Sequence, residues 1–321
     1  MNNLKPEIIA EKKGRTMYKP GRIITFIILL AVLLSGCSTS SKSQNEKMSL
    51  KFGLMPAVDS VPFLLAEKNG YFSELGLNVE LQVFSNAQDR QSALQTNSID
   101  GAITDLIAVA TNVESGFDIK ATTMTNGVFP VLMKEGSEDK QKVKVGMMEV
   151  SVTNFLIDEW LSDKYEIEKV FINEIPARLA AIGSGELNMG LFPEPVASTG
   201  ELNGLVKRIY EPEAGYCPDV AVFTGKALKE KNDAIRLFHQ AYNKAVEELK
   251  NDSGQARDIL IEKIPNVKPE IRDRIVLPEY TKATLPDTDY IQRVIDWTST
   301  TVNKKLAVTP EDLIERKYTG K

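Results

Sequence analysis

The chain has 321 residues, with 39 Lys and Arg, 44 Asp and Glu, one histidine and two cysteines. Its length allows two domains with a sizeable core, and its composition is that of an ordinary globular protein. The net charge of −5 argues against nucleic acid as a partner, because nucleic-acid binding requires basic patches.

An apolar run near the N-terminus is too short to span a bilayer and is typical of the core of a signal peptide. The run covers residues 23–34 and ends in Leu34-Ser35-Gly36-Cys37. Small residues before a cysteine match the bacterial lipobox, in which the cysteine receives a diacylglycerol and becomes the mature N-terminus. We therefore predict a signal peptide over residues 1–36, with Met17 as an alternative start, and a lipid on Cys37. The alternative is a secretory signal without lipid.

Charge separates this leader from the rest of the chain. Residues 1–36 carry six basic and two acidic residues, a net of +4, so a total of −5 leaves −9 on the remainder. Lipid rather than surface charge would therefore hold the protein on a membrane. Residues 37–47 are polar and predict a flexible tether.

Three strand–helix units follow between Leu50 and Gly116. The predicted strands cover residues 50–55, 78–84 and 100–105, and the helices cover 63–69, the region of Ala93-Leu94, and 106–113. Repeated strand–helix units predict a parallel sheet covered by helices. Ligands bind such sheets beyond the carboxyl ends of the strands, where loops turn into helix N-termini. We expect three polar pairs at that edge, facing one cleft: Asp59-Ser60, Ser85-Asn86 and Thr104-Asp105.

A second, smaller series of strands and helices follows. A strand over residues 117–124 ends at Thr125 and Asn126, which are again expected to face the cleft. After a charged connector come strands at 144–148, 170–172 and 186–192, with helices at 155–161 and 177–182. This repetition predicts a second α/β lobe. Its polar turns are expected to face the same cleft through Ser151, Thr153, Asn154, Glu174 and Glu194.

The C-terminal third is predicted to return to the first lobe and to be mainly helical. A strand at 220–224 would rejoin the first lobe, and apolar residues at helical spacing between Ala234 and Leu249 would pack inward. Further helices are predicted at 287–302 and 310–314. These boundaries assign residues 48–132 and 218–321 to lobe 1 and 133–217 to lobe 2, with hinges near Met133 and at 216–218.

Several motifs along the first series resemble one known family. They are Gly53-Leu-Met-Pro, the run from Pro62 to Phe72, the run from Leu75 to Leu81, and Ala93-Leu-Gln followed by Ile99-Asp-Gly-Ala. The chain is similar to the solute-binding proteins of ABC importers for nitrate, taurine, alkanesulfonates and thiamine-precursor pyrimidines. The resemblance covers essentially the whole mature chain, and its most specific part, Ala66 to Val79, is a signature of the fold more than of the ligand.

The resemblance implies a two-lobed α/β fold of the type II periplasmic-binding-protein class, with the ligand cleft between the lobes. It further implies a monomeric lipoprotein on the extracytoplasmic face of the cell membrane. Such a protein captures a small organic solute and passes it to a membrane permease and, through the permease, to an ATPase subunit. The alternatives are an enzyme on the same fold, as in pyrimidine-synthase and menaquinone-pathway relatives, and a ligand-sensing receptor subunit.

The sequence offers few residues for a catalytic site or a metal site. The only histidine, His239, falls inside a predicted helix far in sequence from every cleft loop and is expected to be a packing or surface residue. If Cys37 is lipidated, Cys217 has no partner within the chain. We therefore expect no enzyme activity, no metal and no cofactor, although a site made of carboxylates alone stays open.

The charge of the ligand can be weighed from the cleft residues. Helix N-termini favour anions, but four predicted cleft residues are acidic: Asp59, Asp105, Glu174 and Glu194. The two nearby arginines, Arg90 and Arg178, are expected at the surface. The sequence therefore favours a neutral or partly cationic organic ligand, such as a heteroaromatic vitamin precursor, with Asp105 as the preferred contact. Each polar residue before a helix can instead be a cap.

Overall fold

The computed structural model describes residues 48–319. The predicted signal peptide, the lipidation site at Cys37 and the tether lie outside the described residues. Within residues 48–319, no helix is long and apolar enough to cross a membrane.

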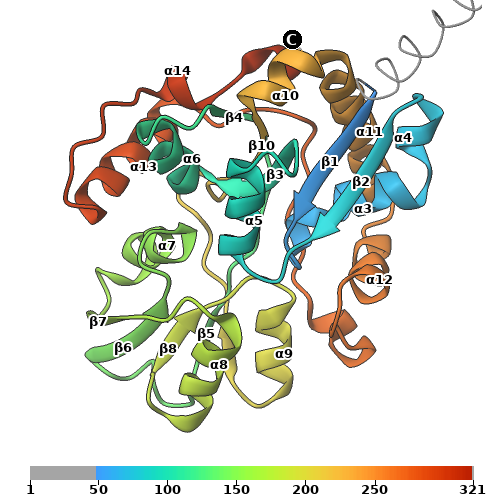
Figure 1. Cartoon of the computed structure of the whole chain (residues 1–321). Coiled ribbons are helices and arrows are strands. Elements are labelled where there is room, and N and C mark those ends of the chain that lie inside the picture. The colour runs from blue at the N-terminus through green and yellow to red at the C-terminus, as the bar shows by residue number, and fades with distance from the viewer. Residues whose placement is uncertain (1–47, 320–321) are drawn as a thin grey trace, which may run out of the picture. The chain divides into compact units, whose positions relative to one another are not determined.

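The fold contains two five-stranded sheets (Figure 1), and the strands of each are arranged in the same pattern. The first has the order β2-β1-β3-β10-β4 and the second β7-β6-β8-β5-β9. The first sheet contains β1 (Ser49–Leu54), β2 (Asn78–Val83), β3 (Gly101–Asp105), β4 (Ile119–Met124) and β10 (Asp219–Thr224). The second contains β5 (Val131–Met133), β6 (Lys142–Met147), β7 (Glu166–Phe171), β8 (Met189–Leu191) and β9 (Val206–Arg208).

One strand in each sheet runs against its neighbours. β1 pairs in parallel with β2 and β3, while β10 is antiparallel to β3 and β4. In the second sheet β6 is parallel to β7 and β8, and β5 is antiparallel to β8 and β9. β5 and β10 are the strands that the chain forms directly after passing from one sheet to the other. Strand β10 rejoins the first sheet, as predicted.

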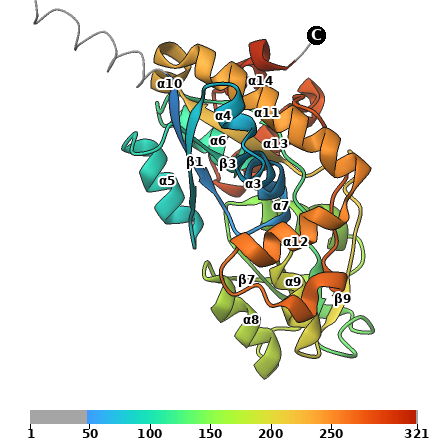
Figure 2. The ribbon, with the colours of Figure 1, turned by 90° about the vertical axis from the view of Figure 1, so that its right-hand side faces the viewer.

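Helices cover both faces of the first sheet. On one face lie η1 (Val58–Ser60), α3 (Val61–Lys68), α4 (Tyr71–Glu74), α10 (Gly225–Glu230), α11 (Asn232–Asn251), α12 (Gly254–Lys263) and η2 (Pro269–Arg274). Figure 2 shows α11 and α12 on the same side as α3. The aromatic rings of Phe52, Phe63 and Phe238 meet in this core, with centroids 4.7–5.3 Å apart. The predicted inward face of α11 is confirmed, because Ala234, Phe238, Ala241, Ala245 and Leu249 are buried and the half-buried Leu237 packs against the same core.

The other face of the first sheet is covered by α6 (Leu106–Glu114), α13 (Thr288–Thr301) and α14 (Pro310–Leu313). The remaining elements of the first half and the C-terminus are α5 (Ala87–Gln95) and η3 (Arg316–Tyr318). The second sheet carries α7 (Val152–Leu161), α8 (Ile175–Ser184) and α9 (Val196–Leu202). A separate core forms under α8 and α9 around Leu132, Ile182 and Phe192.

The crossing points differ slightly from the predicted boundaries. The chain passes to the second sheet between Met124 and Val131, earlier than the predicted change at residue 133, because Val131 and Leu132 already pair with β8 and β9. Met133 therefore lies within a strand and not in a crossing segment. The return segment runs from Ile209 to Pro218 and includes the predicted position.

His239 is a buried packing residue, one of the two roles expected for it. Its Nδ1 lies 2.8 Å from the carbonyl oxygen of Ile235, and its Nε2 lies 3.0 Å from Oγ1 of Thr122. Burial lowers the pKa of His239 to about 4, so the imidazole is neutral near pH 7.

Candidate functional site

A cavity of about 870 Å³ is lined by segments that follow strands of both sheets. From the first sheet come residues 55–59 after β1, the first turns of α5, and the end of β3 with the start of α6. From the second come residues 148–153 between β6 and α7, the start of α8, and Pro193 after β8. The carboxyl ends of parallel strands meet here, where binding sites of open α/β sheets form.

Five of the predicted site residues line this cavity. They are Asp59, Thr104, Asp105, Ser151 and Thr153. Asp105 has two roles, because its Oδ1 accepts a hydrogen bond from the backbone N–H of Ala108 at 2.8 Å and so caps α6 while the residue lines the cavity. The structure thus combines the two alternatives weighed for this residue, capping and exposure to the cleft.

Eight other predicted site residues do not line the cavity: Ser60, Ser85, Asn86, Thr125, Asn126, Asn154, Glu174 and Glu194. Most of those that are buried form hydrogen bonds within the protein. The Ser60 hydroxyl donates to the carbonyl of Met55 at 2.7 Å, and the Asn154 side chain donates to the carbonyl of Glu149 at 2.6 Å. Asn126 donates to the carbonyl of Glu279 at 2.8 Å.

One of the predicted site residues caps α5. Asn86 is its N-cap, and its Oδ1 accepts from the backbone N–H of Asp89 at 2.8 Å. Ser85 is exposed, and so is Glu174, which precedes α8 without a side-chain cap. Neither residue lines the cavity.

Glu194 is wholly buried in an ion-pair network outside the cavity. Its Oε1 lies 3.1 Å from Nζ of Lys207, and its Oε2 accepts from the hydroxyl of Ser198 at 2.7 Å. The backbone N–H of Val276 also donates to it, at 3.3 Å. This carboxylate ties the second sheet to the segment after η2, and sequence reasoning missed the contact because Val276 lies 82 residues further along the chain.

Charged side chains concentrate on the wall formed by the first sheet. Asp59, Arg90, Asp105 and Asp219 all line the cavity. Nη2 of Arg90 donates to Oγ1 of Thr104 at 3.0 Å, and the guanidinium acts on all three carboxylates through space. Arg90 was expected at the surface, but only 7% of it is exposed.

Burial shifts the pKa values of these carboxyls. It raises the pKa of Asp59 to about 6, although the Thr125 hydroxyl, 3.3 Å from Oδ2, and Arg90 favour the charged form. Burial and the neighbouring charges of Asp59 and Asp105 hold the pKa of Asp219 well above its usual range. Burial also raises the pKa of Asp105, against the N–H groups at the start of α6 and Arg90.

Arg178 lies on the opposite wall, in the first turns of α8. It was expected at the surface, but only 1% of the side chain is exposed. Its guanidinium lies over the ring of Phe192, 5.2 Å from the centroid. A Cβ on Gly146 of β6 would come within 2.9 Å of the Arg178 side chain, so glycine at this strand position makes room for the arginine. That glycine is the one sequence signal that could have indicated the burial of Arg178.

Between these charged walls the lining is mainly apolar. Met55, Ile103, Phe129, Met148 and Ile175 all contribute to it. Such a site suits an organic molecule held by a few polar groups. Among residues 48–319, no group of three or more His, Cys, Asp and Glu side chains is placed to hold a metal ion.

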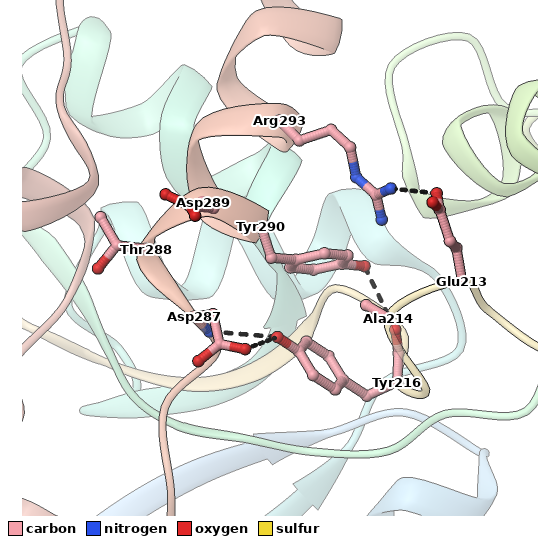
Figure 3. Close-up of a pocket in the computed structure, with 8 residues that line it drawn as sticks. All are labelled: Glu213, Ala214, Tyr216, Asp287, Thr288, Asp289, Tyr290 and Arg293. Atoms are coloured by element: carbon pink, nitrogen blue, oxygen red, sulfur yellow. Dashed lines mark hydrogen bonds and ion pairs between the residues drawn. The ribbon is translucent and has the colours of Figure 1, made fainter.

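A second pocket, of about 560 Å³, lies where the return segment meets the start of α13 (Figure 3). Its polar groups already pair with one another. The Tyr216 hydroxyl accepts from the backbone N–H of Asp287 at 3.2 Å, and Arg293 forms an ion pair with Glu213 at 2.5 Å. This pocket is therefore a brace for the return segment and a weaker candidate than the cavity between the sheets.

Comparison with known proteins identifies the fold. Residues 43–199 match the model of the NMT1-like family. This part of the chain, just under half of its length, is therefore similar to that family. A protein of Brachyspira hyodysenteriae that is named as an ABC transporter periplasmic binding protein is 22% identical to this chain over 277 residues. The match covers 76% of this chain and 79% of the relative.

Solved structures share the fold over most of the chain. The ligand-binding component of an ABC-type import system from Staphylococcus aureus, with zinc bound, has a TM-score of 0.72 at 20% identity, covering 84% of this chain and 97% of that one. The alkanesulfonate-binding protein SsuA from Xanthomonas axonopodis pv. citri, bound to MOPS, has a TM-score of 0.68 at 16% identity, covering 84% and 98%. The periplasmic-binding-protein fold predicted from the sequence is thus confirmed.

Proposed function

We propose that the protein is the extracytoplasmic solute-binding component of an ABC importer, with a lipid on Cys37 as its membrane anchor. It captures a small organic solute in the cavity between the two sheets and delivers it to a membrane permease, which works with an ATPase subunit. The observation that carries this proposal is the cavity itself, which both sheets line and in which charged side chains are buried. The similarity to periplasmic binding proteins supports it.

Binding would be coupled to movement of the two sheets relative to each other. The two crossing segments, residues 125–130 and 209–218, are the natural hinges. Closure is favoured only by contacts that exist when both walls touch the solute. The closed protein would then dock on the permease, and a lipid anchor keeps it close by raising its effective concentration there.

The proposal is tested by small-molecule binding to purified protein. A solute bound at a hundredfold excess over its dissociation constant should raise the free energy of unfolding by about 2.7 kcal/mol. Asp105→Asn keeps an acceptor for the cap of α6 and removes the charge, so it should weaken binding without unfolding the helix. Asp139→Asn, at an exposed position away from the cavity, is the matched control.

The same experiment separates binding from catalysis. After incubation with the protein, the solute should have an unchanged mass in mass spectrometry. The amount bound should be one equivalent per protein. A solute converted to product over many turnovers would point to the enzyme alternative instead.

A further inference from the structure

Among residues 48–319, Arg178 is a buried cation without an anionic partner. Nε and Nη1 of its guanidinium are buried and make no hydrogen bond to any residue of this part of the chain. Within residues 48–319 it forms no ion pair, and burial alone lowers its pKa. A buried guanidinium of this kind is costly to the folded protein unless something pairs with it. Because Arg178 lines the cavity, the partner it lacks can be supplied by an anionic group of a bound solute.

On the opposite wall, two buried carboxylate oxygens lack hydrogen-bond donors within residues 48–319. Oδ1 of Asp59 and Oδ2 of Asp219 are buried and have no hydrogen-bond partner among the described residues, and each residue is only 5% exposed. Their nearest cation is Arg90, which is shared with Asp105 and whose Nη2 bonds to Thr104. One oxygen of each of these carboxyl groups therefore lacks a donor, and a cationic nitrogen could supply it.

Charged groups are unevenly divided between the two walls. The first sheet's side contributes four carboxyl groups to the lining, those of Asp59, Asp89, Asp105 and Asp219, against the one guanidinium of Arg90. Asp59 and Asp219 are both desolvated, which raises the pKa of each carboxyl group. Acidic groups therefore outnumber basic groups on this wall, opposite the single guanidinium of Arg178 across the mainly apolar lining.

We propose that the solute is a zwitterion, with a cationic nitrogen at Asp59 and Asp219, an anionic group at Arg178, and an apolar body between them. This inference rests on the proposed function and narrows it to a class of solute. A simple anion would leave Oδ1 of Asp59 and Oδ2 of Asp219 without donors, and a simple cation or a neutral ring would leave Arg178 unpaired. A zwitterion also touches both walls at once, which is the condition for ligand-driven closure.

The test uses purified protein that has been unfolded and refolded to remove any bound small molecule. The protein is immobilised and equilibrated with the fraction below about 1 kDa of a bacterial cell extract, and retained compounds are identified by mass spectrometry. The expected result is retention of a compound that carries both a cationic nitrogen and an acidic group. Its affinity should fall about 10- to 100-fold in Arg178→Gln and in Asp59→Asn, the range expected for losing a hydrogen bond to a charged group. It should be unchanged in Asp139→Asn.

Two derivatives of the retained compound then assign each end. Wild-type protein should bind both the N-acylated form, which lacks the positive charge, and the ester, which lacks the negative charge, more weakly than the parent. Arg178→Gln should no longer distinguish the ester from the parent, and Asp59→Asn should no longer distinguish the N-acylated form from it.

Retention of a compound with a single charge, or equal weakening of both derivatives in both variants, would overturn the zwitterion inference while leaving solute binding intact. Retention of no compound at all would count against the proposed function as well.

Discussion

Replacing Arg178 by methionine should stabilise the empty protein and weaken its binding of solute. Methionine keeps an unbranched side chain of similar length above Gly146 and removes the buried charge. The folded protein no longer has to hold a guanidinium away from water and from any anion, so the free energy of unfolding should rise.

The expected size of the gain follows from the pKa of Arg178, which burial lowers to about 10. Each tenfold change in proton affinity corresponds to about 1.4 kcal/mol, so burial costs the folded state roughly 3 kcal/mol. This cost is present below pH 10 and disappears as the pH rises further, because the folded protein releases this proton before the unfolded chain does. The substitution also removes the cation–π contact with Phe192, which lowers the expected gain in stability by about 1 kcal/mol.

The net gain is therefore about 2 kcal/mol, equivalent to about 4–8 °C in Tm for a protein of this size. Urea unfolding of solute-free protein at pH 7.5, followed by circular dichroism, measures it. Arg208→Met is the control, because Arg208 lies in an exposed ion pair with Glu138 at 3.0 Å and should change stability by less than about 1 kcal/mol. A loss of more than about 1 kcal/mol in Arg178→Met would refute the argument, since it would mean that the guanidinium is stabilising in the empty protein.

Three further predictions concern buried groups. Asp59→Asn should reduce the fall in stability as the pH rises from 4 to 7, because the folded protein keeps the Asp59 proton up to about pH 6 and the unfolded chain releases it near pH 4. In urea unfolding, the wild type should lose about 1.4 kcal/mol between pH 5 and pH 7.5 that the variant keeps. The ring of His239, the only histidine, should give one NMR signal that does not titrate above pH 5, and its neutral burial should cost stability as the pH falls from 6.5 to 4. Gly146→Ala should destabilise the folded protein by about 1–3 kcal/mol through overpacking, because a Cβ at this position comes within 2.5 Å of Leu187. In Gly183→Ala, in α8, the new Cβ meets nothing within 4 Å, so this substitution should be neutral or stabilise the protein by about 0.5–1 kcal/mol.

Each of these predictions has a clear contrary result. An unchanged pH profile in Asp59→Asn would mean that this carboxyl titrates normally in the folded protein. A histidine signal that shifts near pH 6.5 would show that the imidazole is exposed to solvent. Equal effects of the two glycine substitutions would mean that β6 is not tightly packed under α8.

The strand–helix order could be predicted from the sequence because it depends on local signals. In the first series the predicted strands begin and end within two residues of the observed ones. The prediction was poorer for β7, where only residues 170–172 were expected as strand. Its first half alternates charged with apolar residues, and Lys142 and Lys144 of the neighbouring strand form ion pairs with Glu166 and Glu168 on its exposed side. Pairing across strands, which the sequence does not show, extends β7 to Glu166.

The edge of the sheets at which a solute can bind was determined by the sequence alone, because the carboxyl ends of parallel strands necessarily meet there. The identity of the side chains in the cavity was decided only by the tertiary structure. A polar residue before a helix can cap it, as Asn86 does, or line the cavity as well, as Asp105 does, and both look the same along the chain. The burial of Arg178 depends on the close approach of α8 to Gly146, since a long charged side chain reaches water by default and only packing from another element can prevent it.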